Sequence, residues 1–199
     1  MFAAAAIALS ACHPYIAGGY DPAASIHGPL AQVATAPIAT ARSTSIAAAA
    51  PADSASTSAG DSYSLAIGAG VRAFTVEVGV HAHGLTSGAL TIPDANSQQP
   101  GMAHYLTASS SLDLHWHWLQ WRRFSTDLHA GPAAGLLLDR MSGEKSWAQG
   151  FRYGTGVDFR LSPAIVFVDV YRTGLTFSGG PAIGYSDITG ITIGLALRE

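Results

Sequence analysis

The sequence predicts an all-β protein: an antiparallel up-and-down β-barrel that crosses a membrane with eight strands, preceded by a disordered tether rich in alanine and serine. Three observations predict it. Apolar and polar residues alternate with a period of two in seven segments after residue 61. The connections between these segments alternate between short and long. Hydrophobic residues make up 48% of the chain and charged residues 12%, so many apolar side chains need a core or lipid around them.

The chain opens with a signal-like segment, residues 1–11, in which residues 2–11 are small and apolar. Leu9-Ser10-Ala11-Cys12 resembles the lipobox of bacterial lipoproteins, and this resemblance implies cleavage before Cys12 and lipidation of its thiol. Cys12 is the only cysteine, so it has no disulfide partner within the chain. No positively charged residue precedes the apolar run, which departs from the usual signal. The alternative is an uncleaved alanine-rich signal whose cysteine is incidental.

Residues 12–60 have low complexity. Alanine occupies 21 of the first 60 positions, and only Asp21, Arg42 and Asp53 carry charge there. Such a segment buries too little apolar surface to offset the entropy of ordering it. We therefore expect a flexible tether, followed by a barrel domain over 61–199.

The alternation is clearest between Leu112 and Trp118, where four apolar residues alternate with Asp113, His115 and His117. Its seven segments are residues 62–72, 74–84, 102–120, 126–138, 147–161, 165–175 and 188–198. Their apolar faces are expected to meet lipid, and their polar faces to line the lumen. Pro132 cannot donate to a strand ladder, so it marks a bulge or a local break.

The connections predict how the strands are oriented. Tight turns follow the first, third and fifth segments, whereas long polar or glycine-rich loops span 85–101, 139–146 and 176–187. In outer-membrane barrels, short turns face the periplasm and long loops face outward. A closed antiparallel barrel needs an even number of strands, so one strand should precede residue 62. The best candidate lies within 36–50.

Two groups of residues separate a membrane barrel from a soluble one. The first is an expected membrane-interface girdle at a tight turn, made by Trp116, Trp118, Trp121 and Phe124. The second is an expected ion network in a narrow lumen, made by Arg72, Glu77, Asp113, Arg152, Asp158, Arg160 and Asp169. A lipocalin-like soluble barrel on a lipid tether, binding a small apolar ligand, is the alternative, because it uses the same alternation with its apolar face inward.

The last three segments resemble the end of the small eight-stranded outer-membrane barrels of the OmpA and OmpX kind. The resemblance is carried by residues 153–163, which end in Leu-Ser-Pro, by Tyr171-Arg172 within 168–172, and by Ile-Gly-Leu within 191–198. It implies the bacterial outer membrane as the location. One departure is the final Leu-Arg-Glu, because such barrels usually end in Phe or Trp.

Five histidines fall on predicted lumen faces: His81, His83, His115, His117 and His129. If the turn at 121–125 centres near Arg123, His117 and His129 face each other across a hairpin. Two His-x-His pairs could bind Zn²⁺ or Cu²⁺. The alternative is a hydrogen-bonded lumen plug that also contains Asp113 and Glu77.

The sequence favours a non-enzymatic role in envelope structure or surface interaction. The lipid A deacylases, a group of barrel enzymes, need a His-x-Ser pair, and no histidine here is followed two residues later by serine. A lipid-modifying enzyme is therefore a second alternative. We expect no cofactor, a monomer, contact with outer-membrane lipid, and an extracellular partner at the loops 85–101, 139–146 and 176–187. The net charge of −3 gives no electrostatic support for a nucleic-acid partner.

Overall fold

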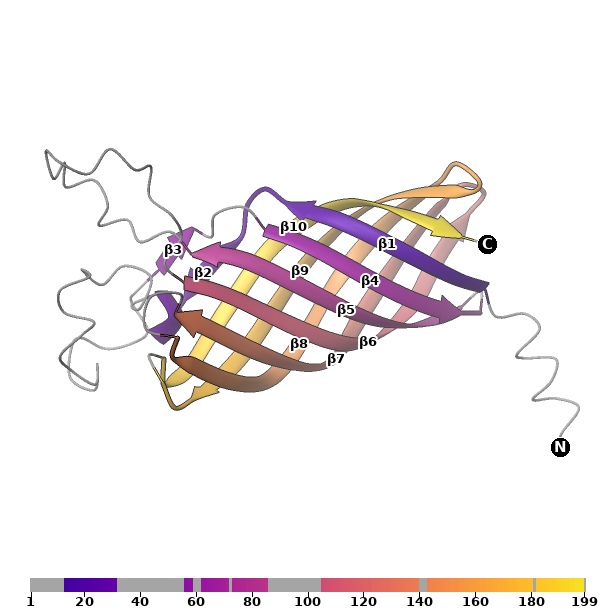
Figure 1. Ribbon diagram of the computed structural model, residues 1–199. Helices are drawn as coiled ribbons and strands as arrows, with labels where there is room; N and C mark the ends of the chain where they lie inside the picture. Colours follow the sequence, from indigo (N-terminus) through magenta and orange to yellow (C-terminus); the bar gives the residue numbers. More distant parts are fainter. Residues whose placement is uncertain are drawn as a thin grey trace, which may run out of the picture.

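The computed structural model is a closed antiparallel barrel of eight strands (Figure 1). It describes residues 13–31, 56–58, 62–71, 73–85, 105–139, 143–180 and 182–198. The barrel strands are β1 (His13–Asp21), β4 (Ser62–Gly70), β5 (Phe74–Leu85), β6 (Tyr105–Trp121), β7 (Phe124–Asp139), β8 (Lys145–Arg160), β9 (Ala164–Ser178) and β10 (Gly184–Arg198). Two short strands, β2 (Ser25–His27) and β3 (Ser56–Ser58), extend the sheet beside β10. No helix in the described ranges is long and apolar enough to cross a bilayer.

The fold class and all seven predicted segments are confirmed. Each segment coincides with one of the strands β4 to β10, and each strand pairs with the next in antiparallel register. The predicted irregularity near Pro132 is a local break: the β6–β7 pairing stops at Ser111 and Ala133 and resumes at Leu114 and Ala130.

The position of the eighth strand corrects the sequence prediction. The strand that closes the barrel is β1, which pairs with both β4 and β10, whereas the candidate within 36–50 lies outside the described residues. Part of the predicted tether is therefore barrel wall. The alternation of β1 is hidden because its inward face carries Tyr15 and Ala17 and its outward face Ile16 and Tyr20, so both faces read as apolar.

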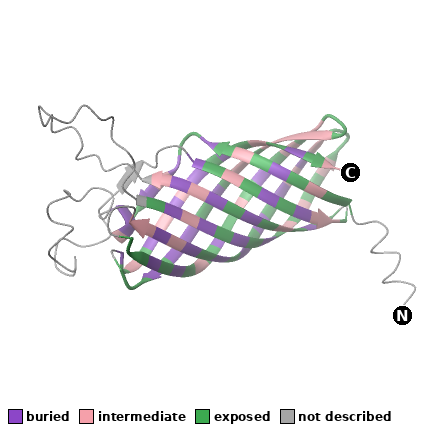
Figure 2. Cartoon of the chain, viewed as in Figure 1, coloured by how far each residue is buried: buried purple, intermediate pink, exposed green. Residues whose placement is uncertain are grey.

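The outer surface of the barrel is apolar. Figure 2 shows exposed residues alternating with buried or intermediate ones along the strands that face the viewer. The exposed positions are large aliphatic and aromatic side chains such as Ile67 at 61%, Leu195 at 59% and Val78 at 54% exposure. An apolar exterior around a polar interior is the reverse of a soluble barrel, and it suits a lipid environment.

Exposed aromatic residues mark both ends of this apolar surface. Trp116, Trp118 and Trp121 lie toward the end with the tight turns, here called the short-turn end. Toward the opposite, long-loop end lie Tyr20, Tyr63, Trp147 and Tyr185. Twelve strand steps from Trp147 to Phe159, at about 3.3 Å each and a tilt of about 40°, span about 30 Å along the barrel axis. That height matches the hydrocarbon layer of a bilayer.

The lumen is divided into two parts, which the sequence analysis did not foresee. At the long-loop end, the chain leaving β2 turns inward over residues 28–31 and buries Ile26 and Leu30 completely. They pack in one apolar cluster with Leu137, Leu175 and Phe177, and the Leu30 amide donates to Ser186 Oγ at 3.0 Å. We call this cluster the apolar cap. Below it, the lumen is polar.

Candidate functional site: the polar lumen

The register between β6 and β7 decides which side chains meet in the lumen. His115 lies opposite His129, and His117 lies opposite Asp127. The prediction that His117 faces His129 is therefore wrong. The register slips by one residue between His117 and Leu119, where the ladder bulges above the tight turn.

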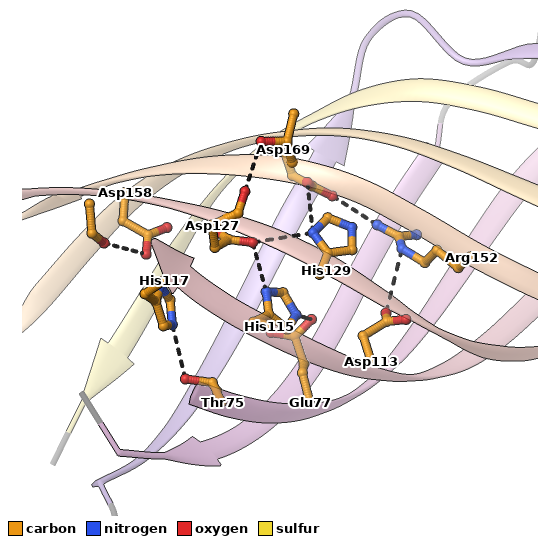
Figure 3. Close-up of polar contacts among 12 residues, drawn as sticks. Thr75, Glu77, Asp113, His115, His117, Asp127, His129, Arg152, Asp158 and Asp169 are labelled. Atoms are coloured by element: carbon orange, nitrogen blue, oxygen red, sulfur yellow. Dashed lines mark hydrogen bonds and ion pairs between the residues drawn. The ribbon is translucent and has the colours of Figure 1, made fainter. Parts of the chain in front are cut away.

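An aspartate between two histidines forms the centre of the polar lumen (Figure 3). The Nδ1 atoms of His115 and His129 lie 3.0 and 3.3 Å from the same oxygen of Asp127, Oδ1. The two imidazole rings stack with their centroids 4.7 Å apart. His129 Nδ1 also lies 3.6 Å from Asp169 Oδ1. We call these four residues the His–Asp cluster.

Arg152 of β8 connects this cluster to the cap side of the lumen. Its Nη2 donates to Asp169 Oδ2 at 2.9 Å, and its Nη1 donates to His81 Nε2 at 2.9 Å. Its guanidinium also lies 3.6 Å from Asp113 and 4.1 Å from the ring centre of Tyr171. A buried arginine with two carboxylates and an aromatic face is well compensated.

Two tyrosine hydroxyls attach β1 to the polar lumen. Tyr15 donates to Glu77 Oε2 at 2.5 Å, and Tyr171 donates to the buried Asp21 at the end of β1. Asp21 also accepts a hydrogen bond from the amide of Ala23 at 3.0 Å. From the lumen side, these hydrogen bonds fix β1, the strand that closes the barrel.

Two glycines of β8 make room for the cluster. A Cβ at Gly156 would lie 2.6 Å from Asp127 Oδ2, and one at Gly154 would lie 2.6 Å from His129 Nε2. Because β8 lies directly beside β7, any larger residue at these positions would displace the cluster.

The lumen opens at the short-turn end. A cavity of about 120 Å³ is lined by His115, Asp127 and Asp169. The wider mouth below it, about 430 Å³, shares His117 and Arg160 with that cavity. The mouth is basic, since its lining also includes His13, Arg122 and Arg198.

The remaining predicted residues have the following places. Among the histidines, His83 is buried against Ser62 Oγ at 2.9 Å, and His117 contacts Thr75 Oγ1 at 3.0 Å. Asp158 accepts from Ser125 at 3.1 Å, and Arg160 lies beside the same serine. Trp116, Trp118 and Trp121 lie on the exterior and Phe124 is half-buried beside them. Cys12 and Arg72 lie outside the described residues.

The central residue, Asp127, was missed by the sequence analysis. Asp127 lies inside the predicted segment 126–138 and shares the face of His129 two residues later, but it was not named among the expected lumen residues. Tyr15 and Asp21 were missed because β1 was assigned to the tether. Alternation extended backward from His129 could have found Asp127, whereas Tyr15 and Asp21 carry no such signal.

Several imidazole and carboxylate atoms of the polar lumen have no hydrogen-bond partner. They include Nε2 of His115 and His129, Oδ1 of Asp113 and Oδ1 of Asp169. Three groups of ligand-type residues lie close enough to share one ion: His115 with Asp127 and His129; Glu77 with Asp113 and His115; and His117 with Asp127 and Asp158. The Ser62–His83 pair, joined at 2.9 Å, is buried, with exposures of 0% and 2%.

Comparison with known proteins agrees with this geometry. No protein-family model and no curated protein sequence matches the chain. Among solved structures, neisserial surface protein A (NspA) is similar at a TM-score of 0.60 and 12% identity, covering 94% of this chain and 97% of its own. Ail, the attachment invasion locus protein of Yersinia pestis, in complex with the heparin analogue sucrose octasulfate, matches at a TM-score of 0.52 and 10% identity, covering 94% and 99%. The chain therefore has the fold of the small eight-stranded outer-membrane β-barrels.

Proposed function

We propose that this chain is a lipid-anchored, non-conducting barrel of the bacterial outer membrane, and that its long-loop end serves surface interaction. The observation that supports the proposal is a lumen filled by side chains inside an apolar exterior. The cap fills one end with Ile26, Leu30 and Leu137, and the hydrogen-bonded polar lumen lies below it. Eight strands leave room for side chains and none for a channel.

A conductance measurement tests the closed lumen. The full chain, folded into planar lipid bilayers, should give no stepwise current. The reason is that the side chains of the cap and of the Arg152 network would lie across any path through the lumen. A steady single-channel current from the wild-type protein would contradict the closed lumen.

The lipid anchor is supported by the position of β1. His13, its first residue, pairs with Gly70 at the short-turn end, so a lipid on the preceding cysteine would enter the leaflet on that side. Short turns face the periplasm, so this is the inner leaflet of the outer membrane. Growth with a labelled fatty acid should label the wild-type protein and leave Cys12→Ser unlabelled. Equal labelling of both proteins, or of neither, would contradict the anchor.

The surface role is supported by the location of the longest connections between strands. Residues 22–61 and 86–104 join strands at the long-loop end, and β2 and β3 extend the sheet there. A chain with residues 88–102 replaced by a short Gly-Ser linker keeps every described strand. We expect the wild type to restore surface attachment to a deletion strain, and the shortened chain to assemble in the membrane without restoring it. Full restoration by the shortened chain would favour a purely structural role.

A further inference from the structure

We propose that the His–Asp cluster of the polar lumen is a binding site for a transition-metal dication, with Zn²⁺ as the best fit. This inference concerns a site inside the barrel and does not depend on the surface role. Its ligands would be Nδ1 of His115, Nδ1 of His129, Oδ1 of Asp127 and Oδ1 of Asp169.

The three contacts that link these four atoms have lengths that fit a tetrahedral ion. Zinc binds imidazole nitrogen and carboxylate oxygen at about 2.0–2.2 Å, so neighbouring ligand atoms in a tetrahedron lie about 3.3–3.5 Å apart. In the cluster, Asp127 Oδ1 lies 3.0 Å from His115 Nδ1 and 3.3 Å from His129 Nδ1. His129 Nδ1 lies 3.6 Å from Asp169 Oδ1. His115, Asp127 and His129 lie close enough to share one ion as they stand, and Asp169, which contacts His129, would complete the set.

The two aspartates of the cluster also favour a bound cation. Asp127 is 3% exposed, and its ion-pair partners among the described residues are the two histidines, which are charged only if protonated. Arg152 pairs with the other oxygen of Asp169, so Oδ1 of that aspartate is buried without a hydrogen bond. When both histidines are neutral, Asp127 keeps their hydrogen bonds but has no opposite charge in the cluster, and burying an unpaired charge is costly. One dication among these atoms would satisfy both aspartates.

The residues around the cluster also resemble the outer shell of a metal site. Metal-bound imidazoles usually donate their second nitrogen to a carboxylate or carbonyl. Nε2 of His115 lacks a hydrogen bond and lies 3.8 Å from Glu77 Oε1, so a small movement would make that bond. His129 is nearly fully buried, its side chain 1% exposed, and Gly154 leaves the space into which its ring fits. The cavity of about 120 Å³ beside the cluster leads to the mouth.

The residue types point to zinc and its neighbours rather than to calcium or magnesium. Calcium and magnesium prefer sites built wholly from oxygen. Two imidazoles with two carboxylates are a ligand set that Zn²⁺, Co²⁺ and Ni²⁺ accept. Co²⁺ is therefore a useful spectroscopic probe of the same site.

The test is metal binding by the full chain, folded from urea into detergent micelles and freed of metal with a chelator. Calorimetric titration with Zn²⁺ should show one ion per barrel, and Co²⁺ should give the intense visible bands of a four-coordinate complex. His129→Gln should weaken Zn²⁺ binding at least tenfold and abolish these bands. His83→Gln is the matched control, because it is also a buried lumen histidine but lies outside the cluster.

Two outcomes would overturn the proposal. One is the absence of Zn²⁺ binding by the folded wild type at about 100 µM metal, a concentration far above the dissociation constants of structural zinc sites. The other is equal affinity in the wild type and in His129→Gln, which would assign binding to other histidines. Asp127→Asn keeps the shape of the side chain and replaces His129→Gln if that variant does not fold. Slower gel migration after heating identifies the folded barrel in every sample.

Discussion

At the scale of single residues, the polar lumen depends on glycines as much as on charges. Gly156→Ala would place a methyl group 2.6 Å from Asp127 Oδ2, so either the carboxylate or β8 must move. Overpacking of this kind costs about 1–3 kcal/mol. We expect the free energy of unfolding in urea, followed by tryptophan fluorescence in micelles, to fall by this amount.

Gly18→Ala is the control for this substitution. Gly18 is also a strand glycine with ordinary backbone geometry, but its nearest atom to an added Cβ is 3.9 Å away. The stability of this variant should stay within about 0.5 kcal/mol of the wild type, because it touches none of the features that make substitutions costly. Equal losses in both variants would mean that crowding of Asp127 is not the cause.

Residue-scale prediction from the sequence succeeded where alternation applies. It assigned the lumen face of His81, Asp113 and Arg152, because a period of two fixes the face of every residue in a long strand. It could not say which lumen residues meet. That depends on register: the tight turn pairs Trp121 with Phe124, and the ladder slips by one residue beside His117, so that His115 and not His117 lies opposite His129.

At the scale of elements, the apolar cap explains a run of three leucines that does not follow the alternation of apolar and polar residues. Leu136, Leu137 and Leu138 are consecutive, and only Leu137 points inward, where it is fully buried in the cap cluster. Leu137→Ala should lower the free energy of unfolding by about 2–5 kcal/mol, since it leaves a cavity among packed side chains.

The neighbouring residue provides the comparison. Leu138→Ala removes the same atoms from the outward face, where lipid or detergent can fill the space, so its loss should be clearly smaller. Urea unfolding of both variants under one set of conditions measures the difference. A loss at Leu138 as large as that at Leu137 would show that the cap contributes no more than the exterior.

Element prediction failed at β1 for a physical reason. Both faces of Tyr15-Ile16-Ala17-Gly18-Gly19-Tyr20 lack charge, so the strand has no contrast between inside and outside. The hydroxyl of its inward Tyr15 donates to Glu77, a residue 62 positions away. Counting strands did show that one was missing, because a closed antiparallel barrel needs an even number; it could not locate the strand.

At the scale of the whole molecule, the two ends of the barrel define its orientation in the membrane. The tight turns, the start of β1 and the end of β10 all lie at the short-turn end (Figure 1). In bacterial barrels this end faces the periplasm. Ser178, exposed at the far end of β9, should therefore face the outside, and Arg123, exposed in the β6–β7 turn, should face the periplasm.

Single-cysteine labelling tests this orientation. In intact cells of a Gram-negative host, a maleimide that cannot cross membranes should label Ser178→Cys. It should label Arg123→Cys only after the outer membrane is opened. The parent chain, which keeps Cys12, measures any background from that thiol. Labelling of Arg123→Cys in intact cells with protection of Ser178→Cys would mean that the barrel is inserted the other way, which would put the long loops and the cap in the periplasm and remove the basis for a surface role.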